Sequence, residues 1–385
     1  MSPDSTKVKS KVRSSLRKGA GALSWALAEG QTKRVVDTLG PKARNSFGAR
    51  PVAVVTGATG GVGRATASRF AEAGFDVALL ARGDAGLEGA VQDVEAAGGK
   101  ALSLSVDVAD FEDVARAADT IEESLGPIEV WVNDAMTTVF APVGEIEPAD
   151  FKRAVEVTFL GQVWGTMVAL KKMKPRDRGT IVNVGSALAF IGIPLQAAYC
   201  SSKFACRGFF ESTRAELLHE GSNVRLSMVH LPAVNTPQFD WSQTTMEHHP
   251  QPVPPIYEPE IPASFIVEAA LDGRREKIVG VWNKLLVLAS RAVPGLGNQY
   301  AAIGAWSTQL TSMPVEPDRQ VNLRHPVDET KDHGSHGIFD EKAGGTLDPS
   351  FVESLPSTSS NFVKASAATW KEKVEVWKRR VGKAA

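Results

Sequence analysis

Residues 51–63 read PVAVVTGATGGVG, and this stretch decides the expected fold. Its first part, Val52 to Val55, is a short apolar run rich in β-branched residues, which predicts a buried strand. The glycines that follow permit a tight turn, and the segment from Arg64 to Ala73 has the pattern of an amphipathic helix. A helix that begins at such a turn offers unpaired N–H groups and a positive dipole end to phosphate. The stretch therefore predicts a phosphate-binding strand–turn–helix unit.

Outward from this unit, strand and helix patterns alternate along the chain. We expect strands at 52–56, 76–81, 101–106, 128–132, 180–185, 224–230 and 277–281. We expect helices at 62–73, 84–97, 111–125, 148–172, 197–220 and 261–272. This alternation is typical of an α/β, Rossmann-type doubly wound parallel sheet of about seven strands with helices on both faces. Ligands of such sheets bind beyond the carboxyl ends of the strands, so polar residues that directly follow strands are the candidate site.

Three residues have the chemistry of a proton-transfer site. Tyr199 and Lys203 stand four apart in a predicted helix, so both side chains share one face. A phenol has an ordinary pKa of about 10, and a neighbouring ammonium lowers that pKa by favouring the phenolate. Ser186 follows a predicted strand and offers a hydroxyl that can hold a carbonyl or alcohol oxygen. The trio predicts proton transfer to or from such an oxygen.

In their order and spacing, these motifs resemble the short-chain dehydrogenase/reductase family over roughly residues 51–282. The glycine motif reads Thr56-Gly57-x-x-x-Gly61-x-Gly63, and the catalytic motif reads Ser186 … Tyr199-Cys-Ser-Ser-Lys203. Further family elements follow the third, fourth and sixth strands as Asp107-Val108, Asn133-Asp134-Ala135-Met136, and Pro232-Ala233 with Thr236.

The resemblance implies an NAD(P)-dependent oxidoreductase that interconverts a carbonyl and a secondary alcohol by hydride transfer. It implies that Tyr199 is the general acid or base, that Ser186 stabilises the substrate oxygen, and that Lys203 lowers the tyrosine pKa and holds the cofactor ribose. Thr158 stands where the family has the asparagine of a proton relay, which makes it the fourth catalytic candidate. The implied cofactor-binding residues are Thr56, Gly57, Thr59, Gly60, Gly61, Val62, Gly63, Arg82, Asp107, Val108, Asn133, Ala135, Tyr199, Lys203, Pro232 and Thr236.

Arg82, at the end of the second predicted strand, bears on the choice of cofactor. A guanidinium there pairs with a 2′-phosphate, so Arg82 favours NADP, whereas an acidic residue would bind the ribose 2′-hydroxyl of NAD. Asp84, two residues on, keeps NAD open as the alternative. Asp107 also has an alternative role as a helix N-cap, for which Asp110 is the better candidate. Three roles are open for Asn133: it stabilises the central strand, it borders the cofactor, or it is a turn residue.

Two other functions stay open at this point. Gly57, Gly60 and Gly63 also fit the Gly-x-x-Gly-x-x-Gly pattern of sugar-nucleotide epimerases and dehydratases. Thr158 and Met136 depart from the family pattern and leave room for a non-catalytic dinucleotide-binding scaffold.

The segment 231–262 has eight prolines and cannot form a regular helix or central strand. We expect it to act as a lid whose apolar residues wall a substrate pocket: Phe239, Trp241, Met246, Ile256 and Tyr257. No metal site is expected, because His248 and His249 have no Cys or carboxylate cluster beside them.

Composition and charge divide the chain into three parts. The net charge of −1 conceals +8 in residues 1–50 and +4 in residues 351–385, which leaves −13 between them. We therefore expect a basic, partly helical N-terminal extension (1–50), a catalytic domain (51–285), and a C-terminal extension (286–385) with an irregular arm over 307–360 and a basic amphipathic terminal helix.

Two cysteines and no apolar run of about 20 residues indicate a cytoplasmic protein. The basic ends pack on the acidic body of this chain or of a partner subunit, are disordered, or contact an anionic membrane peripherally. No nucleic-acid partner is expected, because no binding module accompanies the charge. The resemblance implies a small-molecule carbonyl or alcohol substrate and a homodimer or homotetramer.

Overall fold

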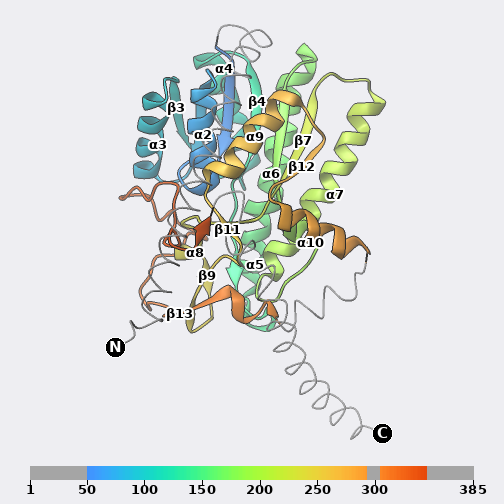
Figure 1. Ribbon diagram of the computed structural model, residues 1–385. Helices are drawn as coiled ribbons and strands as arrows, with labels where there is room; N and C mark the ends of the chain where they lie inside the picture. The colour runs from blue at the N-terminus through green and yellow to red at the C-terminus, as the bar shows by residue number, and fades with distance from the viewer. Residues whose placement is uncertain (1–49, 293–303, 345–385) are drawn as a thin grey trace, which may run out of the picture. The chain divides into compact units, whose positions relative to one another are not determined.

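The computed structural model describes residues 50–292 and 304–344 (Figure 1). A seven-stranded sheet with the order β12-β7-β6-β4-β1-β2-β3 dominates it, and every neighbouring pair is parallel. The strands are β1 (Val52–Thr56), β2 (Asp76–Ala81), β3 (Ala101–Ser105), β4 (Ile128–Asn133), β6 (Thr180–Ser186), β7 (Arg225–Leu231) and β12 (Glu276–Ile278). The predicted doubly wound fold is confirmed, and the strand order reverses between β1 and β4.

Helices cover both faces of the sheet (Figure 1). They are α2 (Gly61–Glu72), α3 (Asp84–Ala96), α4 (Phe111–Ser124), α5 (Pro148–Val155), α6 (Gly161–Met173), α7 (Ala197–His219), α9 (Glu260–Asp272) and α10 (Val281–Ala292). Ala53 and Val55 of β1 join the core formed with α2 and α9, whereas Val52 and Val54 join the core formed with α4, α6 and α7. Alternate residues of a strand point to opposite faces, so the continuous apolar run of β1 follows from burial on both sides.

The helix expected over 148–172 is interrupted. Glu156–Leu160 forms a π-helical turn between α5 and α6. This turn carries Thr158, whose side chain is buried. The whole region has a helical sequence pattern. A π-turn adds one residue to a helical turn without changing that pattern, so the sequence does not predict the interruption.

The proline-rich segment 231–262 is broken into short elements near the carboxyl ends of the strands. These are β8 (Ala233–Val234), α8 (Gln238–Trp241), β9 (Gln243–Thr244), β10 (His248–Pro250) and β11 (Ile256–Tyr257). β9 pairs with β5 (Val139–Phe140), and β11 pairs with β8. Tyr257 and Ile256 are buried, and Tyr257 belongs to the core beneath α9, so these two residues are structural rather than pocket walls.

Residues 304–343, here called the arm, pack on the catalytic domain, and the compact unit of the chain extends through Ala343. β13 (Leu310–Pro314) of the arm pairs with β10, and the next residues run beside α8 toward α2 and α3 (Figure 1). β14 (Ala343–Gly344) follows. Apart from β13, β14 and a short 3-10 turn at Ser307–Gln309, the described part of the arm has no regular secondary structure.

Within the described part of the chain, no helix has both the length and the apolar character needed to cross a membrane. The basic ends, for which we expect an N-terminal extension and an amphipathic C-terminal helix, lie outside the described residues.

Candidate active site

The catalytic candidates meet beside the carboxyl end of β6. Ser186 is the last residue of this strand, and its hydroxyl accepts a hydrogen bond from the N–H of Leu188 at 3.1 Å. Lys203 projects from α7 into the interior, is 3% exposed, and donates from Nζ to the carbonyl of Val184 at 2.8 Å. Its Nζ lies 5.6 Å from the centre of the Tyr199 ring, so the helix places phenol and ammonium on one face.

Burial controls the ionisation of Tyr199. It raises the pKa of the phenol above its ordinary value, and the Lys203 ammonium and a hydrogen bond with Ser186 offset only part of that rise. Lys203 therefore acts on the phenol in the expected direction, but burial has the larger effect on the pKa of Tyr199.

The glycine turn has the form that a dinucleotide needs. Gly57 and Gly61 adopt left-handed φ values of +70° and +55°. A Cβ on Gly63 would lie 2.2 Å from the carbonyl oxygen of Gly57, so only glycine fits there. Gly60 begins α2 and provides no side-chain cap, so the N-cap residue itself accepts no side-chain hydrogen bond from the first N–H groups of the helix. These residues fit a pyrophosphate. Val62 contributes its backbone, because its side chain is buried in the core.

Thr56 links the glycine turn to the residues that directly follow β4. Its Oγ1 accepts hydrogen bonds from the N–H groups of Asp134 and Ala135, at 3.0 and 3.1 Å. A Cβ on Gly57 would come within 2.8 Å of the Ala135 Cα. The structure thus brings together Thr56, Gly57 and Ala135. Thr236 also reaches the turn, since its Cγ2 lies 2.9 Å from the Cβ position of Gly61.

Asp134 is a site residue that sequence reasoning passed over as a variation of the family motif. Its carboxylate reaches the glycine turn, with Oδ2 3.0 Å from the Cβ position of Gly63. Burial raises the pKa of Asp134 to about 7, although Lys203 and the Gly63 N–H favour the charged form. The site therefore holds a carboxyl group that changes charge near neutral pH.

We expect Asp134→Asn to raise the free energy of unfolding at pH 8 by on the order of 1 kcal/mol and to change it little at pH 4.5. Between its ordinary pKa of 3.8 and its folded pKa of about 7, the folded protein keeps a proton that the unfolded chain releases. Stability contributed by the neutral acid is therefore present at low pH and lost as pH rises through 7. Urea denaturation at both pH values tests this, and an equal effect at both would contradict it.

Asn133 and Val108 point into the core. Asn133 accepts a hydrogen bond from the indole of Trp131 at 2.8 Å and donates to Thr166 and Asn183, at 3.1 and 2.9 Å. This is the strand-stabilising role that the sequence left open. Val108 is buried in the core cluster and packs against Gly161 of α6. Neither side chain faces the expected cofactor site.

Asp107 and Thr158 are also committed to protein partners. Asp107 accepts a hydrogen bond from the Arg153 guanidinium at 2.6 Å. Asp110, not Asp107, caps α4, as expected, by accepting from the N–H of Asp113 at 3.0 Å. Thr158 donates from its hydroxyl to the carbonyl of Thr137 at 2.7 Å and accepts from the N–H of the same residue at 3.0 Å. These bonds use its donor, so Thr158 fixes the backbone after β4.

Arg82 does not present a free guanidinium. Its Nη2 donates to the carbonyl and side-chain oxygens of Asn322, at 2.7 and 2.8 Å, and its Nη1 donates to the carbonyl of Arg324 at 2.9 Å. Burial and the neighbouring Arg153 lower the pKa of Arg82. The arm therefore uses the donors on which the expectation of NADP rested.

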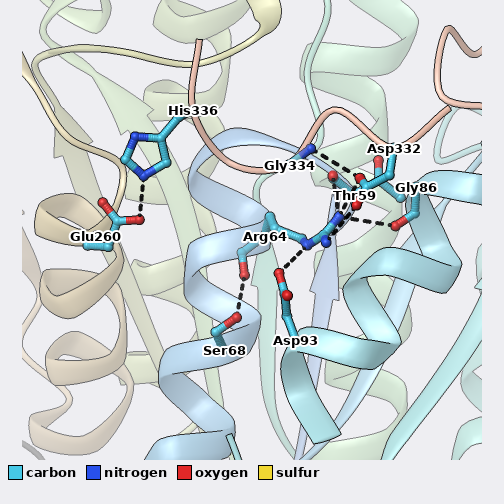
Figure 2. A network of polar contacts seen from close by, with 9 residues as sticks. All are labelled: Thr59, Arg64, Ser68, Gly86, Asp93, Glu260, Asp332, Gly334 and His336. Carbon is cyan, nitrogen blue, oxygen red and sulfur yellow. Dashed lines mark hydrogen bonds and ion pairs between the residues drawn. The ribbon is translucent and has the colours of Figure 1, made fainter. Parts of the chain in front are cut away.

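The arm is also fixed to the helix that follows the glycine turn. Arg64 is buried and forms ion pairs with Asp93 of α3 and Asp332 of the arm, both at 2.7 Å (Figure 2). The same figure shows His336 of the arm against Glu260 of α9, at 2.9 Å. His336 also pairs with Glu258, and these carboxylates raise its pKa to about 10. Both anchors hold the arm across one end of the sheet.

Glu258, His336 and Asp340 bring carboxylate and imidazole atoms within 4.8 Å of one another. His336 lies 3.3 Å from Glu258 and 3.6 Å from Asp340, so the cluster forms ion pairs that secure the arm.

His230, which sequence reasoning missed, supports the strand end behind Ser186. One ring nitrogen contacts the Ser186 carbonyl at 3.1 Å, and the other contacts Glu276 at 2.8 Å. The imidazole is fully buried and leaves no room for a Cβ at Gly185. The only signal in the sequence is a polar residue in the apolar strand RLSMVHL.

Comparison with known proteins points to one family. The model of the family described as short chain dehydrogenase matches residues 51–247. The chain is 31% identical over 274 residues to the uncharacterized oxidoreductase YxnA of Bacillus subtilis (strain 168), covering 71% of this chain and 77% of that protein.

Solved structures show the same fold. A short chain dehydrogenase/reductase from Burkholderia phymatum, in complex with NAD, superposes with a TM-score of 0.59 at 22% identity, over 64% of this chain and 95% of that one. A metagenomic short-chain oxidoreductase, in complex with NADP, gives a TM-score of 0.50 at 27% identity, over 60% of this chain and 95% of that one.

Proposed function

The chain belongs to the short-chain dehydrogenase/reductase family, and from this premise we propose that it is an oxidoreductase that interconverts a carbonyl and a secondary alcohol with a nicotinamide dinucleotide. The observation that carries the proposal is the placement of Tyr199 beside Lys203 and Ser186, at the same sheet edge as the glycine turn. The match over residues 51–247 favours the dehydrogenase branch over the sugar-nucleotide epimerases and dehydratases.

The glycine turn and the start of α2 hold the pyrophosphate, and Lys203 holds the nicotinamide ribose. When bound, the dinucleotide supplies or accepts hydride. Ser186 donates a hydrogen bond to the substrate oxygen as negative charge develops on it. Tyr199 donates its proton to that oxygen in carbonyl reduction and takes a proton from the hydroxyl in alcohol oxidation.

We propose an apolar substrate, because aromatic rings gather beside the lid. The Phe239 ring lies 5.9 Å from that of Phe140 and 6.1 Å from that of Phe339 of the arm. Trp241 meets His333 of the arm edge to face at 5.3 Å. Phe140 and Phe339 are buried, so these contacts pack the arm against the predicted lid, and the half-buried Phe239 and Trp241 are the rings that support an apolar substrate. The homo-oligomer, the cytoplasmic location and the peripheral membrane contact through the basic ends remain predictions from the sequence.

Dinucleotide binding provides the first test. We expect the purified chain to bind NADH or NADPH with a Kd in the micromolar range, typical of nicotinamide enzymes, and to enhance nicotinamide fluorescence. Substituting Gly63 by valine should remove this binding, because the added side chain would overlap the Gly57 carbonyl. Gly144→Ala is the matched control, since a Cβ there meets no atom within 4 Å. An unaltered chain that binds neither dinucleotide would contradict the proposed function, and one that binds but turns over no carbonyl or alcohol would favour the scaffold reading.

A further inference from the structure

A buried carboxylate of the arm lies at the end of β2 without a hydrogen-bond partner among the described residues. Asp328 is 7% exposed. A Cβ on Gly83 would lie 2.1 Å from its Oδ1, and a Cβ on Gly86 would lie 2.3 Å from its Oδ2. The carboxylate therefore rests against the first turn of α3, next to Arg82. Its oxygens are not among the fully enclosed side-chain atoms without a partner, and the N-terminus of α3 favours a negative charge there, so the carboxylate is a hydrogen-bond acceptor with room for a donor.

The arm holds this carboxylate in a fixed position. The N–H of Gly86 donates to the Asp328 carbonyl at 3.0 Å, and the N–H of Ala85 donates to the Glu329 carbonyl at 3.3 Å. Val327, the preceding residue, is buried. Glycine at 83 and 86 is what lets the arm approach so closely, since any side chain there would overlap Asp328. The carboxylate is thus preorganised, and a ligand need not order it.

The position is the one where a doubly wound sheet meets the adenosine ribose. In such sheets a residue at the end of β2 contacts the ribose 2′ position, an acidic residue for NAD and an arginine for NADP. The glycine turn borders the same spot, because Thr59 Cβ lies 2.8 Å from the Cβ position of Gly86. In this chain β2 ends on Ala81 and Arg82, so the strand itself provides no carboxylate.

Charge decides between the two cofactors. The donors of Arg82 are taken by Asn322 and Arg324 of the arm, so a 2′-phosphate would have to displace them. That phosphate would also meet the negative charge of Asp328, which together with Asp107 offsets the guanidinium groups of Arg82 and Arg153. Ribose hydroxyls, in contrast, would donate to the carboxylate, and such charge-assisted hydrogen bonds are among the stronger ones.

We propose that Asp328 is the residue that selects NAD over NADP, with its carboxylate accepting hydrogen bonds from the adenosine ribose hydroxyls and repelling a 2′-phosphate. This inference rests on the proposed function, since it concerns the cofactor of the same site. It replaces the NADP preference that Arg82 indicates in the sequence, because the arm both occupies the guanidinium and brings in the acidic residue.

Fluorescence titration of the full chain with NADH and with NADPH tests the proposal. We expect the unaltered chain to bind NADH more tightly, and Asp328→Asn to shift the ratio of the two Kd values toward NADPH by about 30-fold, the order of one or two charge-assisted hydrogen bonds. Glu329→Gln is the matched control, because this neighbouring side chain is exposed and only its backbone contacts α3. It should leave the ratio within about twofold.

A second measurement compares the binding of NADH with that of an analogue, in the unaltered chain and in Asp328→Asn. An NADH analogue that lacks the adenosine 2′-hydroxyl should bind the unaltered chain about 10-fold more weakly than NADH, and should bind Asp328→Asn nearly as well as NADH does. An unchanged ratio in Asp328→Asn, or equal tightening of both cofactors, would overturn the proposal; equal tightening would mean that the arm merely competes for the site. Failure of the unaltered chain to bind either dinucleotide would overturn the proposed function and this inference together.

Discussion

Tyr199→Phe is expected to lower kcat for carbonyl reduction by about 10³-fold, within the range that a positioned general acid contributes. The substitution removes only the hydroxyl. The ring keeps its half-buried place on α7, and Lys203 keeps its bond to the Val184 carbonyl. The Kd for the dinucleotide should therefore change less than about threefold. Stopped-flow oxidation of NADH with an excess of substrate, together with fluorescence titration, measures the two quantities separately.

Tyr257→Phe is the matched control for this substitution. Its phenol lies in the core beneath α9 rather than at the proposed site, so kcat should stay within about twofold even if some stability is lost. Survival of more than about a tenth of the activity in Tyr199→Phe would remove the tyrosine from the mechanism.

Lys203→Met is expected to affect both chemistry and binding. The long apolar side chain fills the buried space, but the ammonium that partly offsets the raised pKa of Tyr199 is lost. The phenol becomes harder to ionise, so alcohol oxidation should fall by about 10²-fold or more and its pH profile should move to higher pH. The dinucleotide should bind more weakly as well, because the amine no longer holds the ribose.

The matched control is Lys172→Met, on the outer side of α6. This lysine pairs with Asp119 and Glu122 at the surface, and exposed pairs of this kind contribute about 1 kcal/mol or less. It should leave the pH profile unchanged. A Lys203→Met enzyme that keeps the unaltered pH profile would show that the lysine has only a structural role.

Local patterns in the sequence predicted the sheet well. Six of the seven strands match the expected ranges to within one residue at each end, and the glycine turn follows β1 as expected. The seventh, β12, is Glu276–Ile278 and ends three residues before the expected 277–281. The ends of the strands can be predicted from the sequence because a strand buried on both faces requires a continuous apolar run, and polar residues or glycines end that run. The same logic placed Ser186, since it directly follows such a run.

Features that depend on burial or on distant segments were not predictable. The direction of the Tyr199 pKa shift depends on how deeply α7 buries the phenol, which the spacing of Tyr199 and Lys203 does not reveal. Asn133 looked like a site residue, but its side chain turns inward to Asn183 and Thr166. The contact of Asp328 with Gly83 joins residues far apart in the chain, and no sequence pattern near either residue predicts it.

The ion pair between Arg64 and Asp332 spans 268 residues of sequence. A ribosome therefore synthesises all seven strands of the sheet before it synthesises Asp328 and Asp332. A nascent chain that has emerged through β12 has its glycine turn but has neither Asp332 for Arg64 nor Asp328 at the end of β2. Because contacts of such separation form late, this end of the sheet in a newly made molecule is completed only after translation has passed the arm.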